Sequence, residues 1–385
     1  MEKIVIDLLW LRPGKVGGTE SYIRNLLDGF MELKEDFDFT LLVSRDNAET
    51  FREYEEDRRY HLLVANVESA NIAKRIIWQN LFQNRLLRKH GFGKCFEPVY
   101  CKPWLNGGIR YTCVIHDLQA LHYPEYHPFH EVAYSRLCWR MDVMNAARMV
   151  ASSEWVKVDI ERKYHRKDIE VIYIPILVTE KDMVDFEELK CRYGIVKKQF
   201  FYTVSQMIPH KNLRTIIAVM DKIVHSEYGK YNLPKKLVIS GVNGNSAEEL
   251  KRQIKDRNLQ DAVVLTGFIS NEERNSLYQN CHTFLFPSVF EGFGMPPIEA
   301  MLFGTRVITT RCASIPEVTQ GKAVYVDDPY DVDEWIDKVI NGVMQGTLDF
   351  SAYEPENVSR KYLQFLKEPV WEKTDIMPDD HHKKR

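Results

Sequence analysis

The sequence lacks the features that mark membrane spans, disulfide frameworks and nucleic-acid binding. None of its apolar runs approaches the ~18–20 residues that a bilayer-spanning helix needs. Its seven cysteines are an odd number and show no C-x-x-C spacing, which indicates reduced thiols in a cytosolic compartment and argues against zinc. The net charge of −3 gives no reason to expect a nucleic-acid partner. Asp7 interrupts the N-terminal apolar run and no cleavage site follows, so we expect a first strand and not a signal peptide.

The sequence also lacks a recognisable metal-ligand spacing. His116, His122, His127 and His130 gather with Glu125 in one region, but their spacing matches no metal-binding pattern. We therefore expect loop or surface histidines, and no bound metal.

What the sequence does contain is a repeated alternation of short apolar runs and longer amphipathic runs. A chain of 385 residues with 44% apolar content is long enough for two domains, each with its own core. Near-continuous apolar strands between helices predict parallel sheets covered on both faces. The expected strands are residues 3–10, 39–44, 61–66, 95–100, 111–117, 149–153 and 170–175, then 200–205, 236–241, 263–267, 283–288, 306–310 and 323–327.

The alternation runs twice, with a charged and strandless break between the two halves. We predict an α/β chain of two doubly wound, Rossmann-like parallel-sheet domains that face a cleft, where the carboxyl ends of strands hold ligands. The predicted divisions are an N-terminal domain over 1–176, a linker over 177–199, a C-terminal domain over 200–345, and a segment over 346–385 that packs back on the N-terminal domain.

A glycine-rich turn in the C-terminal half predicts an anion site. Residues 289–304 read "VFEGFGMPPIEAMLFG" and follow a predicted strand. Pro297 suits a first helical turn and Gly304 a helix end, so a short helix is expected over 297–303. Gly292 and Gly294 let the backbone expose N–H groups ahead of that helix, where its dipole favours an anion such as a phosphate.

Two acids flank this turn and predict hydroxyl groups on the same ligand. Glu291 precedes the glycines and Glu299 is expected in the first helical turn, where a carboxylate accepts hydrogen bonds from hydroxyls. A ligand with hydroxyls on both sides of a diphosphate satisfies both, and a nucleotide-sugar is such a ligand. The alternative is an ordinary turn with two solvated acids.

Residues at the ends of other predicted strands point to the same place. Lys211 follows the first strand of the C-terminal half, where a cation can neutralise a diphosphate. Gly17 and Gly18 form a second anion-friendly turn, with Thr19 as a candidate helix cap. His116 ends a strand of the N-terminal half and can bond a sugar hydroxyl or carry a proton. Each of these residues taken alone also has an ordinary structural interpretation.

With these residues, the chain resembles the retaining glycosyltransferases of family 4, which have the GT-B fold. The resemblance is strongest over 283–318, which contains a glutamate–seven residues–glutamate motif, and it extends over 200–345 and more weakly over 1–175. The resemblance implies that Glu299 holds the ribose, Glu291 contacts the donor sugar and Lys211 neutralises the diphosphate. It further implies donor contacts from Gly292, Phe293, Gly294 and Met295, a base near Gly267 and Phe268, phosphates covered by Gly17 and Gly18, and a sugar approached by His116.

Two positions depart from the family pattern. Gln206 stands where the family usually has an arginine, so one phosphate cation is absent, and His210 is a candidate substitute. Arg306 stands where a proline is frequent, and we expect it to be a surface residue.

The resemblance implies transfer of a mannosyl- or rhamnosyl-like hexose, with retention, from a nucleoside-diphosphate sugar to a saccharide or lipid-linked saccharide. No metal or other cofactor is implied, and the expected location is cytoplasmic, with possible contact at the inner face of the membrane. A nucleotide-sugar epimerase and a non-catalytic nucleotide-sugar-binding protein remain alternatives. A nicotinamide-dependent oxidoreductase is disfavoured, because "GVNGNS" at 241–246 does not match G-x-G-x-x-G.

A basic amphipathic stretch bears on the membrane question. Residues 73–90 are expected to form a helix with Ile77, Trp78, Leu81 and Phe82 on one side. Such a helix either lies at an anionic membrane surface or packs its apolar side on its own domain.

Overall fold

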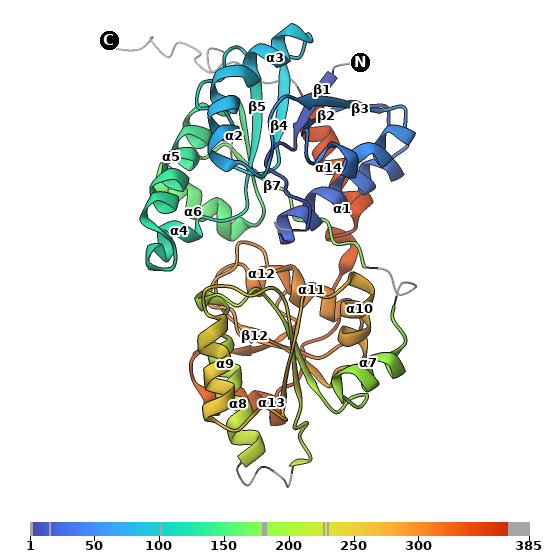
Figure 1. The fold of residues 1–385 in the computed structure, drawn as a ribbon, viewed down its shortest axis with the longest axis vertical. Coiled ribbons are helices and arrows are strands. Elements are labelled where there is room, and N and C mark those ends of the chain that lie inside the picture. The colour runs from blue at the N-terminus through green and yellow to red at the C-terminus, as the bar shows by residue number, and fades with distance from the viewer. Residues whose placement is uncertain are drawn as a thin grey trace, which may run out of the picture.

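The protein contains two parallel β-sheets, one in each half of the chain (Figure 1). A computed structural model describes residues 3–14, 17–100, 102–178, 183–225, 228 and 231–368. Cys101 and the end of the C-terminal segment, 369–385, lie outside the described residues.

The N-terminal sheet has seven strands in the order β3-β2-β1-β4-β5-β6-β7. The direction of strand order changes between β1 and β4, which is where doubly wound sheets hold ligands. Its strands are β1 Lys3–Asp7, β2 Asp38–Ser44, β3 Tyr60–Ala65, β4 Lys94–Glu97, β5 Arg110–Ile115, β6 Arg148–Ala151 and β7 Ile169–Val171. Its helical segments are α1 Gly18–Glu32, the 3₁₀ segment η1 Ala48–Glu56, α2 Ile72–Trp78, the π-helical segment η2 Gln79–Gln83, α3 Asn84–Lys89, α4 Gln119–His122, the 3₁₀ segment η3 Pro124–Tyr126, α5 Phe129–Asn145 and α6 Glu154–Tyr164.

The C-terminal sheet has six strands in the order β10-β9-β8-β11-β12-β13. Its strands are β8 Phe201–Val204, β9 Leu237–Ser240, β10 Val263–Gly267, β11 Thr283–Phe286, β12 Val307–Thr310 and β13 Val324–Val326. Its helices are α7 Phe186–Tyr193, the 3₁₀ segment η4 Pro209–Lys211, α8 Leu213–His225, α9 Ala247–Asp256, α10 Asn271–Asn280, α11 Met295–Leu302, α12 Ile315–Val318 and α13 Val332–Asn341. The 3₁₀ segment η6 Phe350–Ala352 and α14 Pro355–Lys367 follow.

The predicted fold class is confirmed: both halves are doubly wound and every strand that an apolar run predicted is present. Several strands end earlier than predicted. For example, β1 ends at Asp7, yet Leu8, Leu9 and Leu11 are fully buried in a loop, so an apolar run overstates the length of its strand. The exact domain boundaries stay predictions, although the predicted linker contains α7, whose Leu189 is buried in the C-terminal core. Within the described ranges, no helix combines the length and apolarity needed to cross a bilayer.

The C-terminal helix α14 returns to the N-terminal half and packs on α1 (Figure 1). Ser359 Oγ donates a hydrogen bond to the carbonyl of Leu26 over 3.0 Å, and the hydroxyls of Tyr22 and Tyr362 are 3.0 Å apart. Gly29 faces α14 so closely that an added Cβ would overlap the Ser359 hydroxyl and the Pro355 carbonyl. The last helix therefore ties the C-terminal half to the N-terminal half.

We expect Gly29→Ala to destabilise the protein. In a helix interior, alanine is more favourable than glycine by about 1 kcal/mol. Overpacking against α14 costs about 1–3 kcal/mol, and the cost here is at the upper end because the added Cβ meets backbone atoms of α14 that cannot move away easily. The net loss in unfolding free energy, measured by urea denaturation, should be about 2 kcal/mol. Gly93→Ala, where an added Cβ meets nothing within 4 Å, is the control, and equal stabilities for the two variants would contradict this packing.

Candidate functional site

The turn after β11 forms a helix N-terminus on a left-handed glycine. Gly294, with φ of 95°, is the N-cap, and α11 begins directly after it at Met295. The predicted start at Pro297 was therefore two residues late. Glu299 is the fifth residue of α11 and lies beyond the first turn, contrary to expectation. Its carboxylate is correspondingly less able to repel an anion at the helix N-terminus. Gly304, with φ of 66°, follows the helix end as predicted.

Lys211 and Glu291 meet at the carboxyl edge of the C-terminal sheet. Lys211 ends η4, which follows β8, and Glu291 follows the neighbouring strand β11. Lys211 Nζ is 2.6 Å from Glu291 Oε1, and the two side chains are 18% and 11% exposed. The cation predicted for the diphosphate and the acid predicted for the sugar are thus paired with each other.

Glu299 is buried, at 5% exposure, and contacts two residues of α10. The hydroxyl of Tyr278 donates a hydrogen bond to Glu299 Oε2 over 2.8 Å, and Arg274 Nε lies 3.6 Å from the same oxygen. The sequence did not single out Arg274 or Tyr278. No local pattern in the sequence marks them, because they meet Glu299 only through the packing of α10 on α11.

His116 is a neutral hydrogen-bonding group in this structure. Its Nε2 donates to the carbonyl oxygen of Pro98 over 2.8 Å, which leaves Nδ1 as an acceptor. Nδ1 is buried and has no hydrogen-bond partner among the described residues. Burial lowers the pKa of His116 to about 4, so the ring is uncharged at neutral pH.

His210 does not replace the missing arginine. Its ring is buried and contacts the side-chain amide of Gln119 from the N-terminal domain. Burial and the neighbouring charge of Lys211 lower the pKa of His210 to about 3, so it carries no positive charge at neutral pH. Gln206 is exposed. Lys211 is therefore the cation that this loop offers.

The two domains touch at the glycine turn itself. The carbonyl oxygen of Gly292 accepts hydrogen bonds from Ser153 Oγ over 2.8 Å and Ser152 Oγ over 3.3 Å. The carboxylate of Glu317 accepts the first two backbone N–H groups of α6 over 2.8 and 3.1 Å, where a helix N-terminus favours negative charge. No role was predicted for these two serines or for Glu317.

The second glycine turn caps α1 by backbone alone. Gly17 is the N-cap, with φ of 60°, and Gly18 is the first residue of α1. Thr19 was predicted as the cap, but it lies inside the first turn because the helix begins two residues earlier than that prediction requires.

The remaining predicted residues do not share one environment. Gly267 ends β10 with φ of 73°, and Phe268 after it is 75% exposed. Phe293 is buried and packs against the rings of Tyr173 and Tyr353. Arg306 was expected at the surface, but it is half-buried and donates to the carbonyls that end α13, so its role is structural.

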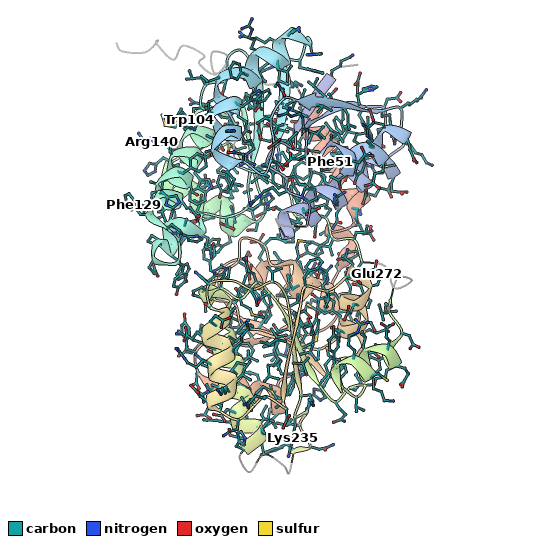
Figure 2. The ribbon with its side chains drawn as sticks, viewed as in Figure 1. Phe51, Trp104, Phe129, Arg140, Lys235 and Glu272 are labelled. Carbon is teal, nitrogen blue, oxygen red and sulfur yellow. The ribbon has the colours of Figure 1, made fainter. Side chains whose placement is uncertain are left out.

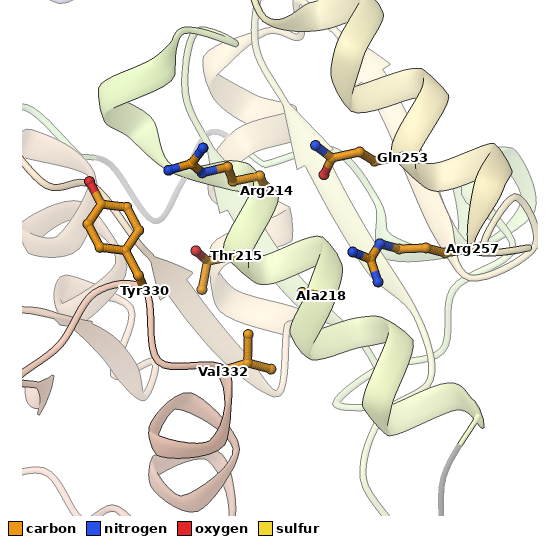
Figure 3. Close-up of a pocket in the computed structure, with 7 residues that line it drawn as sticks. All are labelled: Arg214, Thr215, Ala218, Gln253, Arg257, Tyr330 and Val332. Atoms are coloured by element: carbon orange, nitrogen blue, oxygen red, sulfur yellow. The ribbon is translucent and has the colours of Figure 1, made fainter.

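Two cavities lie beside these residues, and none of the predicted site residues lines either of them. One, of about 350 Å³, lies between α8, α9 and the loop before α13, where Arg214 faces the Tyr330 ring and Arg257 lies beyond Ala218 (Figure 3). The other, of about 150 Å³, is lined by residues 207–209 and 212–213, which flank Lys211, and by Tyr126 of the N-terminal domain. Lys211 instead pairs with Glu291, and the next residue, Gly292, contacts the N-terminal domain.

The described residues contain no group of three or more histidine, cysteine or acidic side chains placed to hold a metal ion.

The fold and the glycine turn define a class of protein. The structure resembles HepE from Anabaena, solved in complex with UDP-glucose, with a TM-score of 0.68 over 95% of this chain and 99% of that one at 15% identity. At that identity the likeness concerns the fold, which is of the GT-B type.

The sequence comparisons give the family. Residues 185–345 match the family model for glycosyl transferases group 1, so this part of the chain is a group 1 glycosyltransferase domain. The chain is 30% identical over 230 residues to an O-antigen chain mannosyltransferase, RfbU, from Salmonella typhimurium. It is 26% identical over 229 residues to O-antigen chain mannosyltransferase B from Escherichia coli. These alignments span 60% and 58% of the two relatives and the same shares of this chain.

We expect Gly292→Ala to separate the two domains. An added Cβ would overlap the carbonyl oxygen of His116, and backbone cannot move away without displacing the domain that carries it. Small-angle X-ray scattering should show a larger radius of gyration than for the wild type, with Gly93→Ala unchanged. An unaltered scattering curve for Gly292→Ala would show that the contact at this glycine does not set the domain arrangement.

Proposed function

We propose that the chain is a retaining hexosyltransferase, which moves a mannosyl- or rhamnosyl-like hexose from a nucleoside-diphosphate sugar to a hydroxyl of a saccharide or lipid-linked saccharide. One observation carries the proposal: the N-terminus of α11, capped by Gly294, lies against Glu291, which pairs with Lys211, and Glu299 follows within the same helix. This arrangement suits a ligand with a diphosphate in its middle and hydroxyls on both sides.

Each predicted residue has a place in this scheme. The backbone N–H groups from Gly292 to Met295 bind the diphosphate, and Glu299 accepts the ribose hydroxyls. On donor binding, Lys211 exchanges Glu291 for the diphosphate, and Glu291 is released to the hexose hydroxyls. His116 Nδ1 accepts a hydrogen bond from a hydroxyl of the same hexose. Gly17 and Gly18 cover the phosphates, and Gly267 and Phe268 border the base.

All the bonds that break and form in the reaction belong to the two substrates. The bond between the anomeric carbon and the phosphate oxygen breaks, the acceptor oxygen bonds to that carbon on the same face, and its proton passes to the departing phosphate. The chain contributes positioning and charge stabilisation, and no metal or other cofactor takes part.

The comparisons support transfer over the two alternatives. The two mannosyltransferase relatives carry names that denote sugar transfer in O-antigen synthesis, and neither is named an epimerase or a binding protein. HepE, which has the same fold, was solved with a nucleoside-diphosphate sugar. These relatives favour a surface-polysaccharide acceptor for this chain as well.

We expect Lys211→Ala to lower turnover with little change in stability. Losing one preorganised charge at a developing anion costs about a hundredfold or more in rate. Sugar transfer and melting temperature should be measured together, with chelator present and absent, and chelator should change neither. Lys222→Ala, which removes a surface lysine paired with Asp333, is the control. Full transfer by Lys211→Ala would contradict the proposed role.

The continuous helical stretch formed by α2, η2 and α3, residues 72–89, supports contact with an anionic membrane surface. Its polar side chains Arg75, Gln79 and Gln83 are buried, while Ile77, Leu81 and Phe82 are 58%, 65% and 49% exposed. Gln83 Nε2 donates to the buried carboxylate of Asp7 over 2.6 Å, which turns the polar side inward. Trp78, predicted on the same apolar side as these three exposed residues, packs partly on the core. The alternative, in which the whole apolar side packs on the domain, is therefore wrong for the three exposed residues.

The surroundings of this helix extend the apolar face and add positive charge. The Trp104–Leu105 loop bonds to Asn80 and Asn84 of the helix, and Leu105 is 76% exposed. Trp104, Arg140 and Phe129 lie along one edge of the N-terminal domain (Figure 2). Residues 71–90 contain no acid and five basic residues, Lys74, Arg75, Arg85, Arg88 and Lys89. We therefore place the chain in the cytoplasm, with this face on the inner leaflet.

We expect the chain to sediment with vesicles containing phosphatidylglycerol at low salt, and less at high salt, because screening weakens the attraction of basic residues to anionic lipid. The double variant Leu81→Ser, Phe82→Ser should sediment less, because it removes exposed apolar surface from this face. Val343→Ser, which changes an apolar residue 72% exposed on the C-terminal domain, should sediment like wild type. The absence of any salt-sensitive sedimentation would remove the membrane contact.

A further inference from the structure

The carboxylate of Glu299 is held on one side only. Tyr278 and Arg274 both belong to α10, and both contact the oxygen Oε2. The Tyr278 hydroxyl is 2.8 Å from Oε2 and Arg274 Nε is 3.6 Å from it. These two contacts leave Oε1 as the oxygen that a ligand hydroxyl can reach.

The chemistry of both partners suits a buried, ionised acid. Burying a carboxylate is costly unless hydrogen bonds and an opposite charge compensate for lost water. The charge of Glu299 raises the pKa of the Arg274 guanidinium, and burial together with Glu299 raises that of the Tyr278 hydroxyl. Both groups therefore remain protonated donors at neutral pH.

Arg274 is more than a packing residue of the core. Its side chain is 23% exposed while that of Glu299 is 7% exposed, so the guanidinium reaches the surface beside the acid. Its Nε is buried and has no hydrogen-bond partner among the described residues. Arg274 therefore pairs with Glu299 by charge, while the hydrogen bond from Tyr278 gives the carboxylate its direction.

We propose that Tyr278 and Arg274 are positioning residues for nucleotide binding: they hold Glu299 by Oε2 so that Oε1 accepts the hydroxyls of the ribose. This inference rests on the proposed function, because it requires a nucleotide at Glu299. It differs from a purely structural role, in which the three side chains only join α10 to α11. The two roles can be distinguished by comparing ligands with and without ribose hydroxyls, because only the positioning role depends on those hydroxyls.

The test compares nucleotides with and without those hydroxyls. Affinities of UDP, GDP, ADP and CDP for the wild type are measured by calorimetry, and the tightest-binding one is compared with its 2′,3′-dideoxy form. In Tyr278→Phe and in Arg274→Met, the affinity for the ribonucleotide should fall about tenfold, in line with a hydrogen bond to a charged group, while that for the dideoxy form stays unchanged. Arg274→Lys, which keeps the charge, should recover part of the loss.

Tyr325→Phe is the matched control, because that hydroxyl also belongs to the C-terminal domain but bonds to Thr319. Melting temperatures are recorded for every variant. If Arg274→Met does not fold, the comparison is made with Tyr278→Phe alone, which keeps the aromatic ring and removes only the hydroxyl. Equal losses for the ribo and dideoxy forms, or no loss for either, overturn the positioning role. A wild type that binds none of these four nucleotides overturns this inference, and one that also fails to bind dTDP overturns the proposed function.

Discussion

The backbone turn between β11 and α11 is the constraint on which the rest of the site depends. At Gly292 the chain passes against the carbonyl of His116 with no room for a side chain, and at Gly294 it takes a left-handed conformation that lets α11 begin at once. Together these positions direct a helix N-terminus toward the place where the domains touch. The carbonyl of Gly292 is held by Ser152 and Ser153 of the other domain, so the turn is also part of the domain contact.

The charges around this turn are balanced within the chain. Lys211 pairs with Glu291, Glu299 with Arg274, and Glu317 with the N-terminus of α6. Partly buried pairs of this kind add little net stability, because desolvation offsets most of the attraction. In the proposed function, phosphates replace Glu291 as the partner of Lys211, and sugar hydroxyls replace Lys211 as the partner of Glu291.

The sequence predicted what local patterns control. Apolar runs between amphipathic ones gave both doubly wound domains, and glycine and proline spacing gave the turn, the short helix and the residues beside it. It failed where a property depends on distant segments. His210 is uncharged because its ring is buried against Gln119 of the N-terminal domain, and Trp78 packs partly on the core while Ile77 beside it is exposed. Arg274 and Tyr278 meet Glu299 only through the packing of α10 on α11, which no local spacing reveals.

The central claim is that the turn after β11 binds the diphosphate of an activated sugar. The most direct measurement is a crystal structure of the chain with its nucleoside-diphosphate sugar. The expected density places the diphosphate at the backbone N–H groups before α11, with Lys211 turned away from Glu291 toward the phosphates. Density for the donor in another part of the protein, with this turn unoccupied and the ion pair intact, would contradict the claim.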